Sequence, residues 1–133
     1  MIDKENEVYT RVRERVMQDF PEVVMDSSYQ PVPSGFPHVS LFQQDSFVPQ
    51  EQLDSATYPK FESLMFDVQV YSNKTSGRKQ ECKQIMAVID TVMSEMNMRR
   101  TILTPVPNLN DASIYRLTAR YEVMVDAGGF YRR

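Results

Sequence analysis

The residue types that most often carry catalysis are scarce in this chain, and they lie far apart. Among 133 residues, His38 is the only histidine and Cys82 the only cysteine. A histidine that acts as a general base needs a nucleophile or an orienting acid within reach. No GxSxG or similar motif is present. His38 follows Pro37 at an expected strand start, which favours a polar residue at a strand edge over a catalytic base.

Metal and phosphate chemistry have no better support. A structural zinc site takes four Cys and His ligands, and this chain has one residue of each type. The four glycines form no phosphate-cradling loop. Four aspartates offer oxygen ligands for a hard cation, but without the spacing of an EF-hand: Asp54, Asp67, Asp90 and Asp111. We therefore expect no cofactor, no metal site and no enzymatic activity.

Composition indicates a globular protein with no affinity for membranes or polyanions. No apolar run approaches the ~20 residues that span a bilayer, and the polar, acidic start of the chain is unlike a signal peptide. A single cysteine cannot form an internal disulfide, which favours a reducing compartment. The net charge is −3 and the cations are scattered, whereas domains that grip nucleic acid usually carry a basic excess.

Two helices are expected from apolar residues at helical spacing. In residues 4–20 these are Val8, Val12 and Val16, with Asp3 as the expected N-cap. Residues 78–96 follow Ser76, the second expected N-cap. Their apolar stripe consists of Cys82, Ile85, Met86, Ile89, Val92, Met93 and Met96. The place of Cys82 on this stripe predicts a buried thiol and not a nucleophile.

Five strands are expected, at residues 23–25, 38–43, 61–71, 99–106 and 114–126. The two connections between the first three, residues 26–37 and 45–59, are long and broken by prolines. Loops of this length in a small domain tend to be functional or disordered. We expect both to be mobile in the isolated chain and to become ordered on assembly.

The order of these elements predicts a single α+β domain. Its core would be an antiparallel or mixed sheet of four to five strands with two helices packed on one face. A meander of antiparallel strands fits the order. Since the helices cover only one face, the opposite face of the last strand should meet water or another subunit.

The last strand is unusually long. Residues 114–126 alternate between apolar and polar side chains almost without fault. At about 3.3 Å per residue the strand would span roughly 40 Å. The diameter expected for a domain of this size is about 36 Å. The strand should therefore cross the whole body or project beyond it, before the turn at residues 127–129 reverses the chain.

This strand and its return supply the candidate interface with a subunit or partner. Its polar face presents Arg116, Arg120, Glu122 and Met124, and the chain ends in Phe130, Tyr131, Arg132 and Arg133. Exposed ion pairs contribute only about 0–1 kcal/mol each, so the charged row would set register more than affinity, or it is simply solvated. The two terminal aromatics need cover, either from the chain's own sheet or from a neighbour.

The same residues carry a resemblance to a known family. Residues 61–71 (FESLMFDVQVY), the helix after Ser76 and residues 107–133 (PNLNDASIYRLTARYEVMVDAGGFYRR) resemble the tail terminator, or tail-completion, proteins of long-tailed bacteriophages. The opening IDKENEVYTRVRERV and Gly35-Phe36-Pro37 before a strand are similar too. The likeness covers most of the chain and is a pattern of elements, not a catalytic signature.

The resemblance implies a virion protein of the tail and neck that assembles in the host cytoplasm. It implies a ring, a hexamer, that caps the tail tube, ends tube polymerisation and offers a docking face to the head-side connector or stopper protein. DNA would only pass through the channel, and no membrane, cofactor or reaction is involved. Arg116, Arg120 and Phe130-Tyr131-Arg132 hold the matching positions.

Two alternatives stay open at the level of sequence. Head-completion and connector proteins of the same particles share this size and general pattern. A small ligand-binding or enzymatic α+β domain, using His38 and neighbouring acids, is the alternative from a different class.

Overall fold

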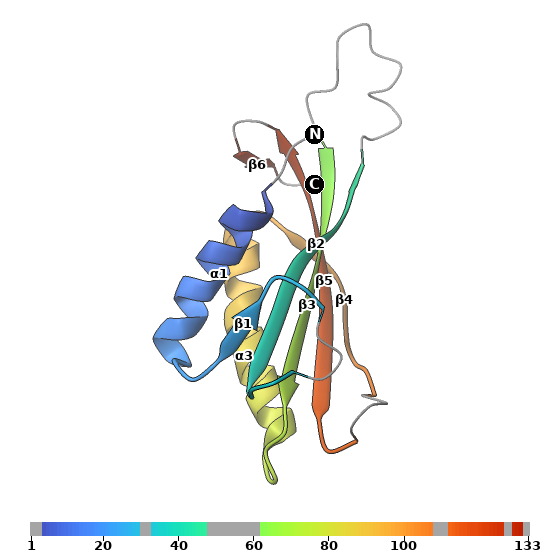
Figure 1. Cartoon of the computed structure of the whole chain (residues 1–133). Helices are drawn as coiled ribbons and strands as arrows, with labels where there is room; N and C mark the ends of the chain where they lie inside the picture. Colours follow the sequence, from blue (N-terminus) through green and yellow to red (C-terminus); the bar gives the residue numbers. More distant parts are fainter. Residues whose placement is uncertain (1–3, 30–32, 48–61, 108–111, 127–128, 132–133) are drawn as a thin grey trace, which may run out of the picture.

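The computed structural model describes residues 4–29, 33–47, 62–107, 112–126 and 129–131. Within these ranges the chain forms a mixed β-sheet with two helices, α1 (Glu5–Asp19) and α3 (Arg78–Glu95), on the same face of the sheet (Figure 1). The predicted α+β class and the one-sided placement of the helices are confirmed. Neither helix is long and apolar enough to cross a membrane.

The sheet has a continuous path of five strands in the order β1-β2-β3-β5-β4, and a short β6 pairs with the end of β5. The strands are β1 (Val24–Asp26), β2 (His38–Phe47), β3 (Glu62–Ser72), β4 (Arg99–Pro105), β5 (Tyr115–Asp126) and β6 (Gly129–Tyr131). All pairs are antiparallel except β1 with β2, which is parallel.

The predicted meander is wrong, because β5 inserts between β3 and β4. After β3, helix α3 carries the chain back along the sheet, so β4 runs in the same direction as β3 and leaves a gap one strand wide. The gap is filled by β5, whose inner residues Leu117, Ala119, Tyr121, Val123 and Val125 are all buried. The long strand that follows β4 in sequence thus becomes an interior strand of the sheet.

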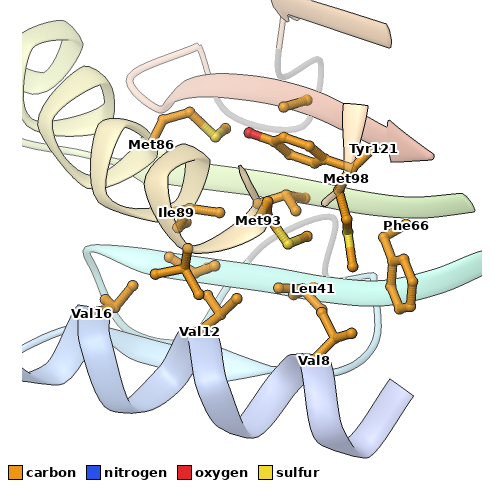
Figure 2. Close-up of a cluster of buried hydrophobic side chains, with 14 of the residues drawn as sticks. Val8, Val12, Val16, Leu41, Phe66, Met86, Ile89, Met93, Met98 and Tyr121 are labelled. Atoms are coloured by element: carbon orange, nitrogen blue, oxygen red, sulfur yellow. The ribbon is translucent and has the colours of Figure 1, made fainter. Parts of the chain in front are cut away.

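One hydrophobic core lies between the helices and the inner face of the sheet (Figure 2). Val8, Val12 and Val16 point from α1 toward Leu41 of β2, and Ile89 and Met93 reach the same space from α3. The faces predicted from the 3.6-residue and two-residue periods are therefore the faces that the structure buries. Met124, expected on the polar face of its strand, lies on the opposite side of the sheet and pairs with Tyr131. Met65 of β3 lies on the same side and pairs with Glu122.

Both predicted N-caps are wrong by one residue. Lys4, not Asp3, precedes α1, and Gly77, not Ser76, precedes α3. Gly77 takes a left-handed backbone conformation with φ of 84°, which a residue with a Cβ adopts at a cost. The tight entry into α3 thus depends on glycine and not on a side-chain cap.

Strand β2 is longer than predicted and takes in the first residues of the expected loop 45–59; the rest of that loop lies outside the described residues. In Figure 1 the ends of β2 and β5, with the start of β3, extend past the helices. This agrees with the expectation that the last strand projects beyond the body.

Candidate interaction surface

The sheet face opposite the helices, called the outer face here, carries most of the polar side chains singled out in the sequence. Arg116, Arg120, Glu122 and Met124 alternate along β5 and all lie on this face, as predicted. Each is half-buried. Neighbouring strands add polar residues directly beside them, because β5 pairs in strict register with β3.

A chain of hydrogen bonds runs along the outer face of β3 and ends at β5. The Tyr71 hydroxyl donates to Oε1 of Gln69 (3.2 Å), and Nε2 of Gln69 donates to Oδ1 of Asp67 (3.1 Å). Nε of Arg120 donates to Oδ2 of the same aspartate at 3.3 Å. All three β3 residues are buried. Polar groups placed so are costly unless bonded, and these satisfy one another.

Arg116 holds a different kind of contact. Its Nη1 donates to the hydroxyl of Tyr29 (3.0 Å), and its guanidinium lies 5.7 Å from the centre of that ring. Tyr29 follows β1 in sequence, so the segment leaving β1 lies over the outer face. Burial raises the pKa of the neighbouring Tyr71 phenol to about 12, although Arg116 acts to lower it. This end of the face is therefore closed by the chain itself.

These contacts bear on one expectation, that the outer face of the last strand meets water or another subunit. Arg116, Arg120 and Glu122 on that strand are half-buried, but Thr118 is buried within the single chain. Buried on the adjacent β3 are Asp67, Gln69 and Tyr71. Long arginine side chains and Tyr29 cover them. The charges of the candidate row also have partners of their own: Arg120 pairs with Asp67 (3.3 Å) and Glu122 with Arg99 (3.9 Å).

The terminal aromatics enter the sheet through their backbone. Phe130 pairs with Val125 and Tyr131 with Met124, in antiparallel register. The predicted return onto the last strand is thus confirmed for β6. Arg132 and Arg133 lie outside the described residues.

The most exposed strand is one that the sequence did not single out. Along β4, every residue from Arg99 to Leu103 is exposed, including two large apolar side chains, Ile102 and Leu103, each 42% exposed. Among the described strands only β5 pairs with β4, so its other edge is unpaired. The sequence feature that could have indicated this exposure is the adjacent Ile and Leu in RRTILTP, since neighbouring residues of a strand point to opposite faces of the sheet.

A groove of about 450 Å³ borders this edge on the helix side of the sheet. Met86 and Ala87 of α3, Leu103 of β4 and Leu117 of β5 supply its apolar lining. Asp90 supplies its polar end, where it accepts from the Tyr121 hydroxyl (2.8 Å) and from Nη1 of Arg100 (3.3 Å). Helix α3 packs mainly on β3 and β5, so it leaves the inner side of β4 partly open.

His38 and Cys82, the single histidine and the single cysteine, are both packed in the interior of the fold. His38 is buried on the outer face, with its ring edge-on to Tyr71 at 5.7 Å and Nε2 at 3.3 Å from the Ser40 hydroxyl. Burial lowers its pKa below the ordinary 6.5. Cys82 is buried as predicted, and burial raises the pKa of its thiol to about 12. A protonated, enclosed thiol is a poor nucleophile.

The described residues contain no group of three or more His, Cys, Asp or Glu side chains that could hold a metal ion. Asp67 and Asp90 are engaged in the contacts given above, and Asp54 and Asp111 lie outside the described ranges. No protein-family model matches the chain, and no curated protein matches it. The geometry and the residues alone therefore bear on its function.

Proposed function

We propose that this protein is a structural subunit of a phage virion, a tail terminator that assembles into a hexameric ring and caps the tail tube. Its partners are further copies of itself, the tail-tube protein and the head-side connector or stopper protein. DNA passes through its channel without tight binding. The resemblance of residues 61–71 and 107–133 to tail terminators supports the proposal.

The observation that carries the proposal is the exposure of the two sheet edges. The path of described strands begins at β1 and ends at β4, and neither strand pairs further. Unpaired edges are attachment points for another chain. Joining one edge to a different edge of the next copy makes a heterologous contact, which closes into a ring when the rotation divides a circle.

Two features of the described residues agree with a role in assembly over a role in catalysis. His38 is buried against Tyr71 and Ser40 and is not displayed in an open cleft. The largest exposed apolar side chains lie on strands at the sheet edges or follow them directly: Val24, Tyr29, Ile102 and Leu103.

Electron microscopy of tube assembly tests the proposal. Purified protein is added to polymerising tail-tube protein, and negative-stain images record tube length and the density at tube ends. We expect capped, shorter tubes. Deletion of Phe130 to Arg133 should abolish capping, because it removes β6 and the chain end, whereas His38→Ala should leave capping intact in protein that folds.

Other outcomes point elsewhere. Rings that bind connector or portal rings but leave tube growth unchanged would favour a head-completion protein. A chain that neither caps tubes nor binds the head-side connector would overturn both assignments.

A further inference from the structure

We propose that β4 of one copy pairs, antiparallel, with β1 of the next copy, so that the sheets of neighbouring subunits join edge to edge. The inference deepens the proposed function, on which it rests, by naming the surfaces through which the copies associate.

The β4 edge is open to a partner strand. Edge strands are usually guarded by charges that project into the path of an incoming strand, by bulges or by prolines. In β4 the bulge and Pro105 lie on either side of Ile102, Leu103 and Thr104. The two arginines are held back against their own subunit, Arg99 by Glu122 and Arg100 by Asp90. No bulge, proline or projecting charge therefore blocks pairing at the central residues of this edge, Ile102 to Thr104.

The β1 edge has matching properties. It lies at the other end of the strand path, and Val24 at its start is 41% exposed. Val24 pairs with His38, an outer-face residue, and Ile102 pairs with Arg120, also on the outer face. When the two edges meet, Val24 and Ile102 therefore lie on the same face of the joined sheet. Each then covers the other's exposed apolar surface.

Strand direction agrees with this pairing. β1 is parallel to β2, and the three steps from β2 through β3 and β5 to β4 are all antiparallel. β4 consequently runs opposite to β1. Rotation about an axis that follows the strands keeps every strand direction, so β4 of one copy meets β1 of the next in the antiparallel sense. This is a heterologous contact of the kind that builds rings.

Charge fits the same orientation. In the antiparallel sense, the start of β4, with Arg99 and Arg100, lies beside the end of β1, which is Asp26. β4 contains no acidic residue and β1 no basic one. The arginines' present pairs are exposed ones, with side chains 52% and 42% exposed. Because these pairs leave both guanidinium groups partly exposed, Asp26 of the next copy, which already accepts from Ser28 (3.2 Å), can lie beside the arginines without displacing Glu122 or Asp90.

The groove beside β4 gives the incoming strand a place for its inner side chains. A strand added next to β4 points alternate side chains to the side of Leu103, where the groove is lined by Met86 and Ala87. On β1 the inner-side residue is Met25, which pairs with inner-face Val39 and packs partly against its own subunit's core, so only the exposed part of its side chain can meet the edge of this groove. The contact is short, because β1 has three residues, so we expect weak association that a docking partner reinforces.

Charge variants at the centre of each edge test the pairing. Ile102→Lys and Val24→Lys each block one edge and leave the other intact, and Thr10→Lys, on the exposed side of α1, is the matched control. Sedimentation velocity and native mass spectrometry over a concentration series report association. Each single variant should associate roughly tenfold or more weakly than wild type, while Thr10→Lys behaves as wild type. Circular dichroism confirms the fold of each.

Mixtures separate this pairing from other arrangements. An equimolar mixture of Ile102→Lys and Val24→Lys has one usable contact and should stop at a dimer. A mixture of Ile102→Glu and Val24→Lys should restore larger assemblies, because the substituted edges attract each other.

Three results would overturn the pairing. Unimpaired association of both lysine variants would place the contact elsewhere, and normal dimers of Val24→Lys with monomeric Ile102→Lys would indicate a symmetric β4–β4 contact. Wild type that stays monomeric at every concentration would also refute it. None of the three removes the proposed function, which fails only if wild type does not cap tubes.

Discussion

Asp67 is the residue on which the outer face depends most. Its carboxylate is almost fully buried, with 4% of the side chain exposed, and it accepts from both Gln69 and Arg120. Each of those donors would lose its partner if the carboxylate were removed. The role is structural, and it ties β3 to β5 across the centre of the sheet.

Asp67→Ala should lower the free energy of unfolding by roughly 1–3 kcal/mol, since a buried donor is left unsatisfied. Urea denaturation followed by circular dichroism measures the change. The matched control is Glu7→Ala, which removes exposed helical pairs with Arg11 (3.1 Å) and Lys4 (3.7 Å) and should cost less than about 1 kcal/mol. Equal effects of the two substitutions would show that the outer-face chain contributes no more than a surface pair.

His38 should make the fold sensitive to mild acid. Burial lowers its pKa in the folded state below the ordinary 6.5, so the unfolded chain takes up the proton first. Stability is then undiminished above about pH 6.5 and falls as the pH drops toward the folded-state pKa, with a slope of up to about 1.4 kcal/mol per pH unit.

The comparison with His38→Gln isolates this effect, because glutamine is polar but does not titrate. Urea midpoints measured between pH 7.5 and pH 5 should fall more steeply for wild type than for the variant. Parallel curves would mean that His38 becomes protonated within the fold without penalty.

At the scale of elements, periodicity in the sequence predicted which face of each helix and strand is buried, but not which strands lie next to one another in the sheet. The valine stripe of α1, the stripe of α3 and the alternation of β5 were sufficient to assign their inner faces. The place of β5 between β3 and β4 could not be inferred, because a two-residue period is the same for any neighbouring strand. The parallel pairing of β1 was hidden for the same reason.

The candidate surface was predictable to a similar extent. Arg116 and Arg120 were correctly assigned to one face, but their partners Tyr29 and Asp67 come from distant parts of the chain. Polar residues that alternate with apolar ones indicate a solvent-exposed face of a strand. Nothing in the neighbouring sequence shows that these polar side chains form hydrogen bonds with one another instead. The exposed Ile102 was missed because β4 lacks alternation.

The entry into α3 permits a sharp test at this scale. Gly77→Ala should destabilise the protein by about 1–2 kcal/mol, the usual cost of a left-handed conformation for a residue with a Cβ. The space around Gly77 is open, so no steric clash adds to that cost.

Ser76→Ala is its control. Ser76 is exposed and does not cap the helix, so its substitution should change stability by less than about 0.5 kcal/mol. Thermal unfolding of both variants gives the answer. A larger loss for Ser76→Ala than for Gly77→Ala would restore serine as the effective cap.

For the whole molecule, assembly should leave a mark on backbone exchange. If copies join through β4 and β1, the amide hydrogens on the outward edges of these strands, which face away from β5 and β2, gain partners only in the assembled form. Hydrogen–deuterium exchange with mass spectrometry, at low and high protein concentration, should show slower exchange in peptides that cover residues 99–105 and 24–26.

Strand β3 is the internal reference for this experiment. It is paired on both sides within the single chain, so its exchange should not depend on concentration. Slowing spread evenly over all strands would indicate general stabilisation and not a specific contact.

The position of β5 also bears on how the protein is made. β3 and β4 leave the ribosome before the strand that separates them in the sheet. Until residues 115–126 have been synthesised, the emerging polypeptide carries β3 and β4 without the strand that pairs with both. The sheet therefore depends on contacts between residues far apart in sequence, which form late. The sheet can therefore close only after residues 115–126 have left the ribosome, and a product terminated before them would expose unpaired strand edges to other nascent proteins.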